Sequence, residues 1–253
     1  MKLNGKTTLL TGATGGLGRA IGAELASAGT TLILSARSRE QLDQLAGELP
    51  GGPHRVVPAD LSTEGAAESL AEEAGEFDVL IANAGVGGGE AIEENSAEAI
   101  KRVSRVNLEV PMLLAAAARN GMLERGDGHM VFISSLAGKA IPVGSALYAA
   151  TKAGLRAFAL GLRADLHESG VGVSSVNPGF VREAGMFHDS GGRPPAKMGT
   201  ASPEDVARAV REAIENDRAD VDVAPIQQKA FVNFAYHFHG LGKRIERALS
   251  GGR

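Results

Sequence analysis

Tyr148 and Lys152 are the residues of this 253-residue sequence whose types and spacing first indicate chemistry. They are four positions apart in a segment with a helical pattern, so the phenol and the ammonium lie on the same helix face. A fixed cation nearby favours the phenolate and lowers the pKa of a tyrosine from its ordinary value of about 10. We therefore expect Tyr148 to act as an acid or a base near neutral pH. Such a pair is also common on solvated helix faces, so the hypothesis depends on further motifs.

Ser135 is the next candidate side chain. It follows the apolar run 129–133, which is typical of a buried strand. Open α/β sheets bind their ligands at the carboxyl ends of strands, which is where this hydroxyl would lie. The helix that carries Tyr148 is expected over 145–169. Few large polar side chains precede Arg163 in it, which indicates burial on more than one face and predicts packing against another subunit.

A glycine-rich turn at 12–18 follows a short β-type run at 6–11 and precedes a helical pattern that ends at Gly29. A strand, a glycine turn and a helix form the entry to a nucleotide-binding βαβ unit. Backbone N–H groups and the helix dipole would bind a pyrophosphate, and a side chain at Gly12, Gly16 or Gly18 would block its approach. The alternative is a glycine-rich turn that binds no ligand.

Arg37 follows the second expected strand, 31–35, where this fold contacts the adenosine ribose. An Asp or Glu there would bind two ribose hydroxyls, whereas an Arg accommodates a 2′-phosphate. The sequence has Ala36 and Arg37, which favours NADP over NAD, unless Arg37 is only a solvated loop residue. Asp60 follows the third strand and either accepts a hydrogen bond from the adenine amino group or ends the strand.

The remaining pattern alternates strands with helices. Further strands are expected at 55–58, 77–81, 171–176 and 220–224, and further helices from Ser62, over 96–119 and from Ser202. This alternation predicts one domain over 1–253 with a doubly wound Rossmann fold. Its parallel sheet should have about seven strands and carry helices on both faces.

The composition excludes several classes of protein. A formal net charge of -4 argues against a nucleic-acid partner, because phosphate binding requires a basic surface. The absence of cysteine excludes disulfides, thiol nucleophiles and thiolate metal sites. His237 and His239 would lie on different faces of a helix, so no metal site is expected. There is no amino-terminal signal pattern and no apolar run of the ~18 residues that span a membrane, so we expect a cytoplasmic protein.

Two further segments are expected to contribute to substrate binding or assembly. Residues 180–200 are rich in glycine and proline and predict a mobile loop over the substrate. Residues 225–253 predict a C-terminal helical segment in which Phe231, Phe234 and Phe238 recur at helical spacing. A subunit contact or a wall of the substrate pocket is favoured over a membrane-surface helix, because glycines at 240 and 242 interrupt the amphipathic pattern.

Together these motifs resemble those of the short-chain dehydrogenase/reductase family, of the classical type. The motifs are Thr11-Gly12-x-x-x-Gly16-x-Gly18, Asn83-Ala84-Gly85, Asn107, Ile133-Ser134-Ser135, Tyr148-x-x-x-Lys152 and Asn177-Pro178-Gly179. They occur in the family's order from about residue 5 to residue 180. Gly15 also allows the glycine spacing of the extended branch, but the short chain and the Asn-Ala-Gly element favour the classical branch.

The resemblance implies a catalytic tetrad of Asn107, Ser135, Tyr148 and Lys152. In the direction of reduction, Tyr148 would donate a proton to a ketone or aldehyde oxygen while a nicotinamide delivers hydride to the carbon. Ser135 would bind the same oxygen, and Lys152 would lower the tyrosine pKa and bind the nicotinamide ribose. Asn107 would hold a water that joins the lysine to solvent. The substrate is expected to be a small, apolar carbonyl compound or alcohol, and the assembly a homodimer or a homotetramer.

The resemblance also implies the cofactor contacts, for NADP or alternatively NAD. They are Gly12, Thr14, Gly15, Gly16, Leu17, Gly18, Arg37, Ser38, Asp60, Leu61, Asn83, Ala84, Gly85, Tyr148, Lys152, Pro178, Gly179 and Val181. Two positions depart from the family. Gly15 replaces a basic residue common in NADP enzymes, and Glu183 replaces a threonine that contacts the nicotinamide amide.

Two other classes of function compete with an oxidoreductase. A non-catalytic dinucleotide-binding or lipid-surface-associated protein would need no acid beside the nicotinamide, so the complete tetrad argues against it. A serine hydrolase is disfavoured because Ser135 lacks the Gly-x-Ser-x-Gly elbow.

Overall fold

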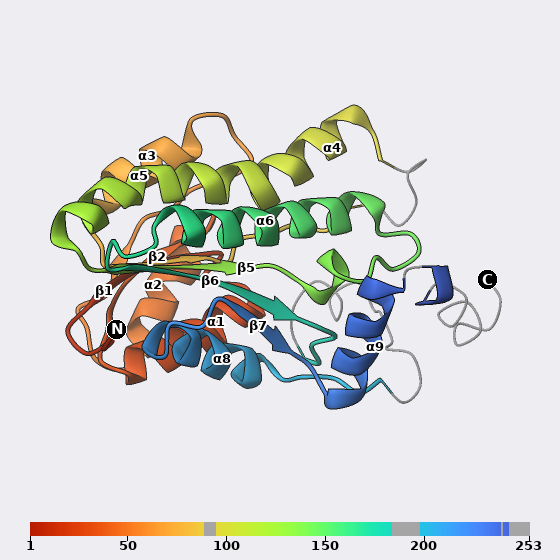
Figure 1. Cartoon of the computed structure of the whole chain (residues 1–253). Coiled ribbons are helices and arrows are strands. Elements are labelled where there is room, and N and C mark those ends of the chain that lie inside the picture. The colour runs from red at the N-terminus through yellow and green to blue at the C-terminus, as the bar shows by residue number, and fades with distance from the viewer. Residues whose placement is uncertain (89–94, 184–197, 239, 243–253) are drawn as a thin grey trace.

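The computed structural model describes residues 1–88, 95–183, 198–238 and 240–242. Within them the chain forms a seven-stranded sheet whose neighbouring strands are all parallel, with helices on both faces (Figure 1). The predicted doubly wound Rossmann fold with a parallel sheet is confirmed.

The strand order is β3-β2-β1-β4-β5-β6-β7. The bounds are β1 Thr7–Thr11, β2 Thr31–Ser35, β3 Arg55–Val56, β4 Val79–Ala82, β5 Gly128–Ile133, β6 Val171–Pro178 and β7 Asp220–Val223. Because β1 pairs with both β2 and β4, the order of the strands reverses between β1 and β4. A sheet of this type binds its ligand beyond the carboxyl ends of the strands at such a reversal.

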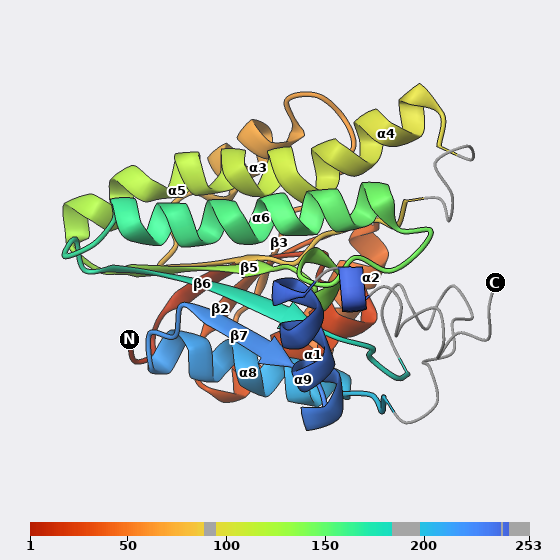
Figure 2. The ribbon, with the colours of Figure 1, turned by 45° about the vertical axis from the view of Figure 1, so that its right-hand side comes forward.

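Helices cover both faces of this sheet (Figures 1 and 2). One face carries α1 (Gly16–Ser27), α2 (Arg39–Glu48) and α8 (Pro203–Glu215), and the other carries α3 (Ala66–Ala74), α4 (Ala97–Ser104), α5 (Val110–Arg125) and α6 (Ala146–Asp165). On each face, apolar side chains of the helices and the strands pack together in a buried cluster. The central strands are therefore buried along almost their whole length. Helix α9 (Ile226–His237) lies beside the carboxyl ends of β6 and β7 (Figure 2).

Two predicted helix starts are confirmed and one is wrong. Ser96 accepts a hydrogen bond from the N–H of Ala99 at 3.2 Å, and Ser202 forms a reciprocal capping box with Asp205. Ser62 is not a cap, because its N–H and hydroxyl both donate to the Asp60 carboxylate, at 3.0 and 2.7 Å. Helix α3 consequently starts only after Gly65, which is in a left-handed conformation.

The chain is helical over 97–125 without a break, so the long helix expected over 96–119 is present, but it contains a wider turn and ends later. The structure has α4, then a π-helical turn η2 (Arg105–Glu109), and then α5. Such wider turns occur mostly at functional sites within helices. Here the turn carries Asn107, which is fully buried.

Parts of two predicted segments lie outside the described residues. Most of the expected loop at 180–200 falls on 184–197, so its mobility stays a prediction. Of the segment 225–253, the structure describes α9 and a short turn, but neither residue 239 nor residues 243–253. Helix α6 ends at Asp165, earlier than expected.

In the described part of the chain, no helix is both long enough and apolar enough to cross a bilayer.

Candidate active site

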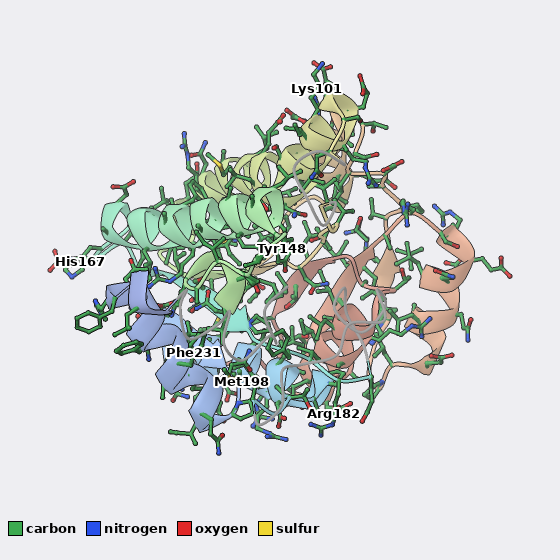
Figure 3. The ribbon with its side chains drawn as sticks, turned by 90° about the vertical axis from the view of Figure 1, so that its right-hand side faces the viewer. Lys101, Tyr148, His167, Arg182, Met198 and Phe231 are labelled. Carbon is green, nitrogen blue, oxygen red and sulfur yellow. The ribbon has the colours of Figure 1, made fainter. Side chains whose placement is uncertain are left out.

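The candidate residues gather at the edge formed by the carboxyl ends of the strands. Figure 3 faces this edge, with Tyr148 at the amino-terminal end of α6. Phe231 of α9 and Met198 are drawn on the same side of the molecule.

Gly12 and Gly18 are required by the packing of the turn itself. Gly12 has a φ of +63°, which favours glycine. A Cβ at Gly18 would lie 2.1 Å from the Gly12 carbonyl oxygen, so α1 can approach the turn only without a side chain there. At both positions a side chain would first meet the protein's own backbone, and the expected block to a pyrophosphate stays a prediction.

The start of α1 presents the groups that bind anions. Gly15 is the N-cap, and no described side chain caps the helix there. Gly15 and Gly16 are exposed, whereas Leu17 packs against the core and the Thr14 carbonyl accepts from Arg19 at 3.2 Å. Uncapped N–H groups and the positive end of the helix dipole suit a phosphate.

Thr11 and Asn83 clasp the glycine turn to the end of β4. The Thr11 hydroxyl accepts from the N–H groups of Asn83 and Ala84, both at 3.1 Å. The Asn83 amide donates to the carbonyls of Thr11 and Gly12, at 3.0 and 3.2 Å. Both motifs therefore meet at the strand reversal, followed by partly buried Gly85. Thr11 was missing from the expected site residues, although the motif contained it.

The residues expected at the adenosine lie after β2 and β3. Arg37 is exposed, and Ser38 caps α2 by accepting from the N–H of Gln41 at 3.3 Å. Hydrogen bonds from Ser62 lower the pKa of Asp60, and the charge of Arg37 lowers it further. Strand β3 ends at Val56, so Asp60 does not end it, and its contact with the adenine stays a prediction. Leu61 is buried beside it.

Tyr148 and Ser135 are brought together through their hydroxyl groups. Burial raises the pKa of Tyr148, and a hydrogen bond with the Ser135 side chain opposes this increase. The expectation that the ammonium of Lys152 would lower this pKa is therefore wrong for the protein alone. Desolvation of the phenolate outweighs the other influences, so Tyr148 is protonated at neutral pH.

Lys152 lies over the ring of Tyr148. Its Nζ is 5.8 Å from the centre of the Tyr148 ring and donates to the carbonyl of Ile133 at 2.8 Å. The residue is only 2% exposed, and burial lowers the pKa of its ammonium to about 8. The neighbouring Ser134 donates to the Lys152 carbonyl at 2.7 Å, which leaves Ser135 as the serine that faces Tyr148.

Ser135 also connects the site to the end of β6. Its hydroxyl accepts from the N–H of Ala137 at 3.1 Å and lies 3.4 Å from the Pro178 carbonyl oxygen. The Gly179 N–H donates to Val223 at 2.9 Å. Val181 is buried and forms an isolated parallel bridge with Ala201.

The side chain of Asn107 is bonded to protein groups, and the water expected at this residue stays a prediction. Its Oδ1 accepts from the Val86 N–H at 2.8 Å, and its Nδ2 donates to the Val86 carbonyl at 2.9 Å and to the Thr151 hydroxyl at 3.2 Å. Both amide donors are thus used by protein groups. The side chain fixes the backbone that follows Asn83-Ala84-Gly85 against α6, and Thr151, which sequence reasoning missed, completes this contact.

Glu183 occupies the position where the family usually has threonine. It is exposed, has a φ of +67° and pairs with Arg182 at 3.2 Å. Its carboxylate is therefore engaged by an arginine. Among the described residues, no group of His, Asp and Glu side chains has the arrangement of a metal site.

Known proteins share both the sequence pattern and the fold. The family model described as short chain dehydrogenase matches residues 6–193. The ketoacyl reductase HetN of a Nostoc species is 37% identical over 227 residues, which cover 87% of this chain and 79% of that protein.

Two solved structures extend the comparison. A serine dehydrogenase complexed with NADP+ is 30% identical with a TM-score of 0.78, covering 88% of this chain and 96% of that one. A short-chain dehydrogenase from Sphingobium yanoikuyae in complex with NADPH is 26% identical with a TM-score of 0.81, covering 98% of this chain and 96% of that one. With the fold, the order of the motifs and these matches in agreement, the chain belongs to the short-chain dehydrogenase family.

Proposed function

We propose that this protein is an NADP(H)-dependent oxidoreductase that interconverts a ketone or aldehyde and an alcohol, with Tyr148 as the general acid and base. The observation that carries the proposal is the contact between the Tyr148 and Ser135 hydroxyls below the buried ammonium of Lys152. A protein that only bound a dinucleotide would not need this arrangement at the ligand-binding edge of the sheet.

The residues of the site fit a dinucleotide. The uncapped start of α1 suits a pyrophosphate, and the exposed guanidinium of Arg37 suits a 2′-phosphate. Asp60 and Leu61 would flank the adenine. Asn83-Ala84-Gly85, Pro178, Gly179 and the Val181 backbone would line the path to Tyr148 and Lys152. The NADP+ and NADPH bound by the two solved relatives support a nicotinamide dinucleotide, and the choice of NADP over NAD rests on Arg37. When bound, the nicotinamide supplies or accepts the hydride.

The protein's own task is to move and hold a proton. In reduction, Tyr148 donates its hydroxyl proton to the substrate oxygen, and Ser135 donates a hydrogen bond to the same oxygen. The raised pKa of Tyr148 keeps the phenol protonated at neutral pH, as a proton donor in reduction must be. Lys152 supplies positive charge over the ring at pH values below about 8.

The surroundings of the site support an apolar substrate. Ile141 and Val143 lie in the segment between Ser135 and Tyr148, and both are exposed, Val143 by 70%. Phe238, which directly follows α9, is also exposed. The name of the relative HetN, a ketoacyl reductase, agrees with a carbonyl substrate. We also propose a homodimer or homotetramer, supported by exposed Ile100 and Met112 on α4 and α5.

The direct test is oxidation of NADPH by the purified protein with a panel of ketones and aldehydes, with NADH as the comparator. Tyr148→Phe removes the proton donor and keeps the ring, so we expect its kcat to fall by about a hundredfold to ten-thousandfold. Binding of NADPH, followed by its fluorescence, should change little. An unchanged kcat in this variant would refute the mechanism.

A further inference from the structure

A cluster of charged residues lies behind the candidate active site, centred on two aspartates of β7. Asp220 and Asp222 belong to the edge strand of the sheet, which contributes no residue to the expected tetrad. Lys139 binds both of them, with Nζ 3.0 Å from Asp220 and 2.5 Å from Asp222. The cluster is largely shielded from water, because the side chains of Lys139 and Asp222 are only 8% and 16% exposed.

Two more residues bind the same carboxylates. Arg156 donates to Asp220 through Nε at 3.2 Å and through Nη2 at 2.6 Å. Asn177 donates to Asp220 at 2.6 Å and to Asp222 at 3.0 Å, and its own Oδ1 accepts from Ser175 at 2.9 Å. The cluster thus combines two cations, two anions and an amide, and partial burial strengthens each contact relative to water.

The protonation states support this arrangement. Although burial is the largest influence and raises the pKa of Asp220, the bonds from Arg156, Asn177 and Lys139 together hold this pKa below its ordinary value. The bond with Asp220, together with a contact to the Tyr236 hydroxyl on α9, raises the pKa of Arg156. Asp220 and Arg156 are therefore ionised at neutral pH, and α9 is attached to the same cluster through Tyr236.

Each partner of the aspartates is close in sequence to a residue of the site. Lys139 directly follows the 3-10 turn η3 (Leu136–Gly138), which Ser135 caps. Arg156 is four positions after Lys152 on α6 and shares its helix face. Asn177 immediately precedes Pro178 at the end of β6. Three segments that come from distant parts of the chain are thus fastened to one pair of carboxylates.

We propose that Asp220 and Asp222 are positioning residues, which hold the Ser135 turn, the Lys152 helix and the end of β6 in register for the reaction. They touch neither the substrate nor the cofactor, and they act through Lys139, Arg156 and Asn177. This role rests on the proposed function. Displacement of a reacting group by ~1 Å costs about a hundredfold in rate, so ion pairs that fix three segments have a large effect on kcat.

The test compares this cluster with a similar ion pair at the opposite end of α6. Arg163 donates to the Asp217 carboxylate through Nη1 and Nη2, at 2.7 Å each. Asp220→Asn and Lys139→Met each break the cluster, whereas Asp217→Asn breaks the distant pair. We expect kcat to fall about tenfold or more in the first two variants and to be unchanged in the third. Lys139→Arg retains a cation and should restore most of the rate.

A second readout does not depend on turnover. The pKa of Lys152, followed through its ¹³Cε resonance, should rise above about 8 in Asp220→Asn, because a loosened turn admits water to the ammonium. In Asp217→Asn it should stay unchanged.

The two proposals fail in different ways. If the wild type reduces no carbonyl compound, the proposed function fails and the Lys152 titration alone decides the positioning role. If the wild type is active but Asp220→Asn and Lys139→Met retain its kcat and its Lys152 titration, the positioning role is overturned. Thermal unfolding of every variant identifies any loss that comes only from misfolding.

Discussion

The behaviour of Lys152 illustrates how burial controls a single residue of the site. Its ammonium is almost completely enclosed, and the carbonyl of Ile133 is its hydrogen-bond acceptor at 2.8 Å. Desolvation disfavours the charged form and brings the pKa to about 8. The same burial raises the pKa of Tyr148. At neutral pH the site therefore contains a protonated phenol below an ammonium group that loses its proton more easily than an exposed lysine does.

This pair predicts how activity depends on pH. The charge of Lys152 is present below its pKa of about 8 and is lost as the pH rises through that value, so we expect kcat/KM to decrease there. Lys152→Arg keeps its charge at every accessible pH, so its lower kcat/KM should show no such decrease. A wild-type profile that stayed level between about pH 7 and about pH 10 would contradict this account.

Arg37 is predicted to select the cofactor. A hydrogen bond to a charged group contributes about 1.5 to 3 kcal/mol, so Arg37→Gln should raise the Kd for NADPH by about tenfold to a hundredfold. The Kd for NADH should not change, because NADH lacks the 2′-phosphate. Arg39→Gln is the matched control, since Arg39 is also exposed and lies two positions away. Equal losses for both cofactors, or a wild-type preference for NADH, would show that Arg37 does not select NADP.

At the scale of elements, the glycine turn and α1 act as one unit. The close approach of α1 depends on Gly18, whereas the clasp formed by Thr11 and Asn83 fixes the turn from the side of β4. Gly15, at the N-cap, has ordinary φ and ψ angles, and a Cβ there would meet only the Gly12 oxygen, at 3.5 Å. The glycines of one motif therefore differ in what they contribute to stability.

This difference can be measured by urea denaturation. Gly18→Ala would place a methyl group against the backbone, and overpacking of this kind lowers the free energy of unfolding by about 1 to 3 kcal/mol or more. Gly15→Ala should lower it by less than about 1 kcal/mol, because alanine is a poorer N-cap than glycine but meets no close backbone atom there. Equal effects of the two substitutions would show that the turn can move away from α1.

At the scale of the whole molecule, the two ends of β5 have different roles: the carboxyl end leads to the active site, and the amino end carries a histidine that affects stability in acid. Ser135 lies just beyond the carboxyl end of β5, whereas His129 is buried near its amino end, with Nε2 at 2.8 Å from the Ser174 hydroxyl. That hydroxyl donates to the Arg218 carbonyl at 2.6 Å, so the histidine must supply the proton of the shared bond. Burial lowers the pKa of His129 to about 4, although Asp217 opposes the decrease.

His129 therefore predicts a loss of stability in acid. The unfolded chain binds a proton at the ordinary pKa of 6.5 and the folded protein only near 4, so the contribution is complete above pH 6.5 and decreases as the pH falls toward 4. The free energy of unfolding should decrease by about 3 kcal/mol over this interval.

Urea titrations at several pH values would measure this decrease. His129→Gln should remove it, whereas His167→Gln should retain it, because the side chain of His167 is 79% exposed. The same pH dependence in all three proteins would assign the acid sensitivity to other groups.

The sequence by itself determined the alternation of strands and helices, the helix start at Ser96, the cap at Ser202, and the order of the motifs. These features depend on neighbours a few positions apart, so their residue types carry the information. The resemblance also placed Tyr148 and Ser135 in one site, and the structure brings their hydroxyls together.

Only the tertiary structure decided the remaining features. The clasp joins Asn83 to Thr11 across 72 positions, and Lys139 reaches Asp220 across 81, so no local pattern marks either contact. The π-helical turn accompanies the contacts that Asn107 makes with Val86 and Thr151. The pKa of Tyr148 depends on how much water the finished fold excludes, which helical spacing does not reveal. Contacts between distant segments and the solvation of buried groups are properties of the assembled sheet and its helices.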